Sequence, residues 1–152
     1  MLGIDAIVML YHCAILSPGD ILEIGSYVGG ATIAIAMGAR DSGKEKKIIG
    51  IEKGVRVDHP RLGTKDSFKD LQKNLKRFGF LNRVTLINGR SFDPNTITIV
   101  RQILGPSQIG LFVFDADASS QRRITMATAY KAQMTAKSSQ YVCWPLVASS
   151  SR

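Results

Sequence analysis

The sequence predicts an α/β fold: an open, mainly parallel sheet with helices on both of its faces. Short apolar segments typical of buried strands alternate along the chain with longer segments of helical periodicity. Two of the apolar segments carry a glutamate at or one residue before their end, and the first of them leads directly into a glycine-bearing turn. Strands that alternate with helices in this way form parallel sheets, and right-handed crossovers place the carboxyl ends of the strands on one edge.

A length of 152 residues leaves room for one domain, which we expect to span residues 1–152. Its hydrophobic fraction of 45% and charged fraction of 21% are ordinary for a soluble globular protein. The two cysteines, Cys13 and Cys143, lie in apolar segments, so we expect buried thiols and a cytoplasmic location. No apolar run approaches the roughly 18 residues of a membrane span, and no membrane partner is expected.

The formal net charge of +8 is unevenly distributed along the chain. No acidic residue follows Asp117, so residues 118–152 form an atypical, basic C-terminal part. Excess positive charge attracts anionic partners, nucleic acid among them. The basic residues have no interleaved aromatic platform, however, and this pattern favours solvated helix faces over a nucleic-acid interface.

The first half of the chain contains two expected helices and two expected strands. Residues 2–16 are apolar and helical in pattern, with a proline- and glycine-containing turn directly after them, and we expect this helix to pack in the core. Residues 21–24 form the first strand. Small and aliphatic residues over 31–40 predict a second helix. Residues 48–52 are again continuously apolar up to a terminal acid, which indicates a second buried strand.

The clearest amphipathic pattern in the chain predicts a helix over residues 65–78. Phe68, Leu71, Leu75 and Phe78 fall on one stripe of this helix, and lysines lie off it. The glycine that follows is suited to a helix C-cap. We therefore expect the stripe to face the sheet.

The rest of the chain completes the predicted sheet. Residues 84–87 and 109–114 are strand-like, and residues 94–104 form a helix with a proline in its first turn. Residues 119–135 are expected to be helical. Residues 141–147 are expected to form a fifth strand, although a proline weakens that assignment. The expected strand order is 3-2-1-4-5.

Groups suited to a nucleoside ligand follow the carboxyl ends of the expected strands, where ligands bind in such folds. The turn over 25–29 offers backbone donors, and Gly25 can adopt a positive φ. Glu52 can accept both hydroxyls of a ribose. Gly89 lets a flat ring lie on the backbone, and Ser91 can hydrogen-bond the edge of that ring. Each signal is weak alone, but the ordered set is hard to explain by packing.

Two classes of nucleoside cofactor share this geometry. The dinucleotide fingerprint G-x-G-x-x-G has a second glycine where this chain has Tyr27. Glu23, before the turn, is an acid able to bind an ammonium group. A ligand with a ribose, an adenine and an amino-acid end therefore fits better than a pyrophosphate.

The chain resembles class I S-adenosylmethionine-dependent methyltransferases, and within them the small-molecule O-methyltransferase and cephalosporin-hydroxylase-like branches. The first motif of that family runs E-x-G-x-x-x-G-x-[ST], which Glu23, Gly25, Gly29 and Thr32 match. The stretches 74–91 and 111–117 resemble the third- and fourth-strand regions. The resemblance covers residues 1 to about 123 and implies a Rossmann-like fold.

The resemblance also implies roles for individual residues. The Gly25 turn and Glu23 would hold the methionine part of the cofactor, Glu52 would bind its ribose, and Asp115 would face the methyl-transfer site as the catalytic candidate. The residues implied to bind S-adenosylmethionine are Glu23, Gly25, Ser26, Tyr27, Gly29, Glu52, Gly89, Ser91 and Asp115.

The chain also departs from the family pattern. In metal-dependent relatives, the acid that matches Asp115 binds Mg²⁺ together with an acidic pair after the fifth strand. No such pair follows residues 141–147, and the family's last two strands are missing. Asp115 and Asp117 alone make a poor Mg²⁺ site, so no metal ligands are predicted.

We therefore expect methyl transfer from S-adenosylmethionine to a nucleophile, an oxygen, on a small molecule. The missing strands and acidic pair motivate one alternative, a non-catalytic or truncated cofactor-binding or interaction domain, whose exposed fifth strand would invite homodimer formation. The net charge motivates a second, an RNA methyltransferase. A nicotinamide-dependent dehydrogenase is a third and weaker alternative.

Overall fold

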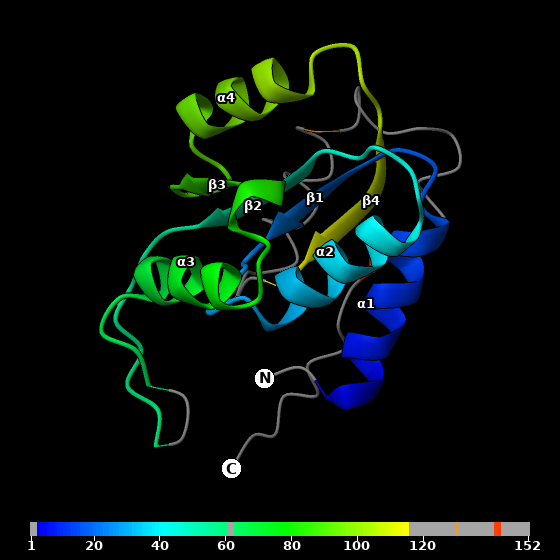
Figure 1. The fold of residues 1–152 in the computed structure, drawn as a ribbon. Coiled ribbons are helices and arrows are strands. Elements are labelled where there is room, and N and C mark those ends of the chain that lie inside the picture. The colour runs from blue at the N-terminus through cyan, green and yellow to red at the C-terminus, as the bar shows by residue number, and fades with distance from the viewer. Residues whose placement is uncertain (1–2, 61–62, 116–129, 131–141, 144–152) are drawn as a thin grey trace.

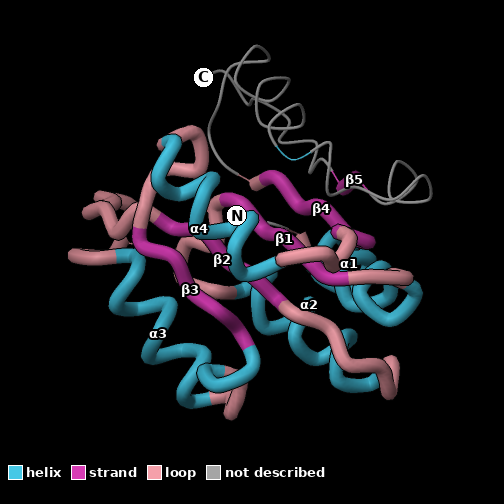
Figure 2. Tube along the Cα trace, turned by 90° about the horizontal axis from the view of Figure 1, so that it is seen from above, coloured by secondary structure: helices cyan, strands magenta, loops and turns pink. Residues whose placement is uncertain are grey.

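In the computed structural model, residues 3–60, 63–115, 130 and 142–143 are described. Within them, five parallel strands form one sheet in the order β3-β2-β1-β4-β5, which confirms the predicted order. Strands β1 to β4 are labelled in Figure 1, and β5 is labelled in Figure 2. The strands are β1 (Asp20–Ile24), β2 (Ile48–Glu52), β3 (Val84–Asn88), β4 (Ile109–Phe114) and β5 (Val142–Cys143). The helices are α1 (Ile4–Leu16), α2 (Gly30–Asp41), α3 (Ser67–Arg77) and α4 (Pro94–Leu104), with a short 3₁₀ helix, η1 (Leu81–Arg83).

The C-terminal elements predicted from the sequence lie mostly outside the described residues. Of the helix expected over 119–135, only Tyr130 is described, and it is helical and fully buried. Of the strand expected over 141–147, only Val142 and Cys143 are described, and they pair in parallel with β4.

Helices cover both faces of the sheet (Figure 2). Helices α1, α2 and α3 pack on one face, against apolar side chains that include Ile21 of β1. Helix α4 and Tyr130 pack on the other face, against Leu22 and Ile24 of the same strand. Side chains alternate along a strand, so Glu23 lies on the same face as Ile21, beneath α2.

Helix α3 begins and ends with well-formed caps. Asp66 is its N-cap, and the Asp66 carboxylate accepts a hydrogen bond from the Lys69 N–H at 3.1 Å. Leu71 and Leu75 are fully buried, as the amphipathic pattern predicts. Beyond the helix, Gly79 adopts a left-handed φ of 77° and turns the chain sharply.

This turn corrects the sequence prediction for Phe78. The helix ends at Arg77, so Phe78 lies just past it and is 55% exposed instead of lying on the buried stripe. The turn at Gly79 is closed by a hydrogen bond of 2.8 Å from the Phe80 N–H to the Leu75 carbonyl, and Phe80 is buried. Helical spacing predicts a buried Phe78, and this prediction is wrong because the helix ends one residue before it.

Helix α1 contributes less to the core than the sequence predicts. Of its side chains, Leu10 and Ala14 are buried, and both belong to the core against α2. Four large apolar side chains remain exposed, namely Ile4, Val8, Met9 and Leu16. No helix among the described residues has both the length and the apolar character needed to cross a bilayer.

Helices α1 and α2 approach each other closely at Gly38. A Cβ atom on Gly38 would lie 2.2 Å from the Tyr11 carbonyl oxygen and 3.0 Å from the Ala14 Cβ. Only glycine permits this separation of the two helix backbones, because a backbone carbonyl has no freedom to move aside.

We predict that Gly38→Ala destabilises the fold by about 1–3 kcal/mol, because the added methyl group forces the two helices apart. The matched control is Gly30→Ala at the start of the same helix, where a Cβ would meet nothing within 4 Å. That variant should keep the stability or raise it by up to about 1 kcal/mol. Urea denaturation of the three proteins measures both changes, and equal midpoints would contradict the close approach.

Candidate functional site

The glycine loop, residues 25–29, connects β1 to α2 in a sharply turned conformation. Gly25 has a φ of 89°, which confirms the positive φ expected for it, and Gly29 has a φ of 95°. Tyr27 also adopts a left-handed φ, of 49°. This conformation costs a non-glycine residue roughly 1–2 kcal/mol, so other contacts must hold the loop in place.

Glu23 holds the loop from below. Its side chain is fully buried, and its Oε2 accepts hydrogen bonds from the Ser26 hydroxyl at 2.7 Å and from the Thr32 hydroxyl at 2.6 Å. Its Oε1 is buried and makes no hydrogen bond. One carboxylate therefore joins the end of β1 to the loop and to the first turn of α2.

Burial raises the pKa of Glu23 from its ordinary value of 4.5 to about 7. The hydroxyls of Thr32 and Ser26 lower this pKa, and the negative charges of Asp115 and Glu52 raise it further. The structure thus brings three of the predicted acids close enough to interact at the carboxyl edge of the sheet.

Glu52, the last residue of β2, holds the loop from the side. Its side chain is 8% exposed. Its Oε2 accepts a hydrogen bond from the Tyr27 backbone N–H, and its Oε1 accepts one from the Ser67 hydroxyl, each at 2.8 Å. The bond to Tyr27 compensates in part for the strained backbone of that residue.

Two residues that sequence reasoning did not single out also contribute to this arrangement. Asn74 of α3 donates a hydrogen bond of 2.8 Å from its side-chain amide to the Val28 carbonyl of the loop. Ser67, at the start of α3, contacts Glu52 as described. The sequence signal for both is weak: each is a polar residue on the clearest amphipathic helix, and only the fold shows what it reaches.

Gly89 and Ser91 follow β3. The Gly89 N–H donates to the Glu52 carbonyl at 3.1 Å, and a Cβ on Gly89 would lie 2.7 Å from the Thr96 hydroxyl of α4. Packing against α4 is therefore sufficient to explain this glycine. The Ser91 carbonyl accepts a hydrogen bond of 3.3 Å from the Tyr130 hydroxyl.

Asp115 follows β4, and its backbone N–H donates to the Ile24 carbonyl of β1 at 2.8 Å. Its side chain is half-buried, and burial raises its pKa above the ordinary value. Asp117 lies outside the described residues. The described part of the chain contains no group of three or more histidine, cysteine or acidic side chains placed to hold a metal ion.

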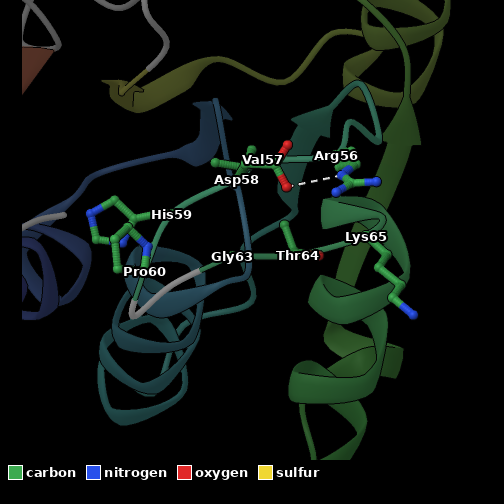
Figure 3. Close-up of a pocket in the computed structure, with 8 residues that line it drawn as sticks. All are labelled: Arg56, Val57, Asp58, His59, Pro60, Gly63, Thr64 and Lys65. Atoms are coloured by element: carbon green, nitrogen blue, oxygen red, sulfur yellow. Dashed lines mark hydrogen bonds and ion pairs between the residues drawn. The ribbon is translucent and has the colours of Figure 1, made fainter.

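A separate hollow of about 510 Å³ lies in the long loop between β2 and α3 (Figure 3). It is lined by Arg56, Val57, Asp58, His59, Pro60, Gly63, Thr64 and Lys65. None of the residues predicted to bind the cofactor lines it. The Arg56 guanidinium and the Asp58 carboxylate pair at 2.9 Å, and both side chains are largely exposed.

We predict that Glu23 makes the stability of the protein depend on pH. Its pKa is higher in the folded chain than in the unfolded one, so the folded state retains a proton that the unfolded state releases between about pH 4.5 and pH 7. Stability should therefore fall as the pH rises through this range. The loss should be on the order of 3 kcal/mol and level off above pH 7.

The variant Glu23→Gln isolates this contribution, because glutamine has the same shape and does not titrate. Urea denaturation of both proteins from pH 5 to pH 8 should show the wild type losing stability relative to the variant. Parallel curves would mean that Glu23 is ionised in the folded protein throughout.

Comparison with known proteins identifies the fold. The sequence matches no protein-family model and no curated protein. Solved structures that match include cofactor-bound Rv0187 from MTB (TM-score 0.65, 21% identity), the methyltransferase PaMTH1 of Podospora anserina bound to S-adenosylhomocysteine (0.61, 21%) and the calicheamicin methyltransferase CalS11 (0.62, 18%). The matches cover 89%, 90% and 88% of this chain, respectively.

This chain spans 53%, 51% and 60% of the lengths of these three proteins. At such low identity the likeness concerns the backbone, and it agrees with the strand order described above. The chain has the Rossmann-like fold of the class I S-adenosylmethionine-dependent methyltransferases.

Proposed function

We propose that this protein binds S-adenosylmethionine at the carboxyl edge of its sheet and transfers the methyl group to an oxygen nucleophile on a small molecule. The observation that carries the proposal is the junction of Glu52 with the glycine loop. There, a nearly buried carboxylate meets a left-handed loop at the edge where ligands bind in folds of this class. The neighbouring structures support the choice of cofactor, since one of them is bound to S-adenosylhomocysteine.

The hydrogen-bond acceptors of the site fit the two hydroxyls of the cofactor's ribose. A carboxylate offers about four lone-pair positions, two on each oxygen. In Glu52, the Tyr27 N–H and the Ser67 hydroxyl use one position on each oxygen. Among the contacts within the described residues, one position per oxygen remains, which matches the two adjacent hydroxyls of a ribose.

For the methionine end, we propose the glycine loop with Ser26, Tyr27 and Gly29 as the contact surface. Glu23 has an unpartnered, buried Oε1, which suits a positively charged group. Its side chain is fully buried beneath the loop, however, so direct contact with the ammonium group would require the loop to shift. Without such a shift, Glu23 supports the loop.

For the remaining parts of the ligand we keep the roles that the sequence suggests. Gly89 and Ser91 would border the adenine. Asp115 would face the transferred methyl group. Because burial raises its pKa, Asp115 is a better proton acceptor than an exposed aspartate.

S-Adenosylmethionine supplies a methyl group already activated on a sulfonium, so the protein's main task is to hold donor and acceptor in line. When bound, the cofactor would supply that methyl group to the acceptor oxygen, and its sulfur would keep the electrons of the broken carbon–sulfur bond. The proton of the acceptor hydroxyl leaves to Asp115 or to water. A cytoplasmic location and a homodimer paired through the fifth strand belong to this proposal as well.

We predict that S-adenosylhomocysteine binds to the purified protein and that Glu52→Gln weakens this binding by about 10- to 100-fold. That range corresponds to the loss of one charge-assisted hydrogen bond. The matched control is Glu45→Gln, an exposed acid in the loop before β2, which should bind like the wild type. Isothermal titration calorimetry measures all three. A wild type that binds NAD but not S-adenosylhomocysteine would overturn the proposal.

We predict that labelled methyl groups pass from S-adenosylmethionine to hydroxyl-bearing members of a small-molecule panel. Asp115→Asn should lower that rate about tenfold or more, because the acceptor proton loses its nearest base. Asp58→Asn, which changes an exposed acid, should leave the rate unchanged. Labelling of amines or thiols alone would refute oxygen as the nucleophile. Binding of the cofactor without labelling of any acceptor would refute the transfer activity.

A further inference from the structure

Ser67 occupies an unusual position for a residue at the start of a helix. It is fully buried, and its hydroxyl contacts a carboxylate 15 residues earlier in the chain. The cap of α3 is provided by its neighbour Asp66, so the Ser67 side chain is not needed to begin the helix. Its hydrogen bonds therefore require a different explanation.

The surroundings of Ser67 fix the direction of its hydroxyl proton. The Ser67 oxygen accepts a hydrogen bond of 3.0 Å from the Val55 N–H, and the Ser67 N–H donates to the Val55 carbonyl at 3.0 Å. While its oxygen accepts from Val55, the Ser67 O–H donates to Glu52 Oε1 at 2.8 Å. The result is a directed chain of hydrogen bonds from Val55 through Ser67 to Glu52.

This chain of bonds restricts how the Glu52 carboxylate can rotate. The Tyr27 N–H holds Oε2, and the Ser67 hydroxyl holds Oε1 from another element of the fold. With one protein donor on each oxygen, the plane of the carboxylate is fixed, and so are the directions of the lone pairs left over. Terminal torsions of this kind are otherwise broad.

We propose that Ser67 is a positioning residue that sets the orientation of the Glu52 carboxylate for the two adjacent hydroxyls of a ribose. This inference rests on the function proposed above and adds to it a determinant of selectivity for ligands with an intact 2′,3′-diol. Ser67 acts through Glu52 and does not itself touch the ligand.

The test is a thermodynamic cycle between Ser67 and the ribose hydroxyls. Calorimetry measures the binding of S-adenosylhomocysteine and of its 2′-deoxy and 3′-deoxy analogues to the wild type and to Ser67→Ala. In the wild type, loss of a ribose hydroxyl should weaken binding about tenfold. In Ser67→Ala, that penalty should shrink about three- to tenfold for at least one analogue, because the carboxylate is no longer aligned with the diol.

Two further variants separate positioning from a general structural role. Ser67→Cys keeps the size of the side chain but is a weaker donor, so its penalty should fall between those of the wild type and Ser67→Ala. Ser42→Ala removes a hydroxyl at the far end of α2, which donates to the Ala39 carbonyl and accepts from the Lys44 N–H, and this variant should show the wild-type penalty. Thermal melts identify any variant that fails to fold, and Ser67→Cys then provides the comparison.

The outcomes distinguish this inference from the proposed function. A wild type that does not bind S-adenosylhomocysteine defeats both. A second outcome is that the wild type binds S-adenosylhomocysteine, while removal of a ribose hydroxyl weakens binding equally in the wild type, Ser67→Ala and Ser67→Cys. That result defeats only the role of Ser67. A penalty that decreases from serine through cysteine to alanine supports it.

Discussion

The buried carboxylate of Glu23 supports the glycine loop, on whose shape the candidate site depends. Removing a carboxylate from water costs several kcal/mol unless hydrogen bonds compensate for the loss. Here, the hydroxyls of Ser26 and Thr32 compensate only in part, since the pKa of Glu23 is still raised to about 7, but their hydrogen bonds fix the loop to β1 and to α2. Glu52 adds a second point of attachment through the Tyr27 N–H. The loop can therefore keep a strained backbone without a ligand.

The sheet could be predicted from the sequence because its central strands are buried on both faces. Such strands appear as continuous apolar runs, and β1, β2 and β4 are buried along their whole lengths. The sequence predictions of burial were wrong where an apolar pattern continues beyond the residues that the rest of the fold covers. Phe78 matches the stripe of α3, but the turn at Gly79 ends the stripe and buries Phe80 instead. Likewise, the apolar side chains of α1 outnumber the positions that α2 covers.

The candidate site was predicted in outline, and its supporting contacts were not. Glu23, Gly25 and Glu52 follow from strand ends and glycine spacing, which are local features of the sequence. Ser67 and Asn74 act across long separations in the chain, and a serine or an asparagine on a helix has many ordinary roles. Gly89 is a different case. The sequence suggested room for a ring, and the structure adds a packing reason for the glycine, because a Cβ there would lie 2.7 Å from the Thr96 hydroxyl.

The cluster of Glu23, Glu52 and Asp115 gives the strand edge a local field that opposes that of the whole molecule. The protein carries a formal charge of +8, yet these three acids lie close enough to raise the pKa of one of them. At long range the net charge of the protein attracts anions, whereas close to these three acids negative charge is repelled and positive charge is favoured. Added salt screens the long-range attraction of anions to the surface more than the attraction of a cation to these partly buried acids. The same protein should therefore release loosely held polyanions at an ionic strength that still permits a cationic ligand to enter.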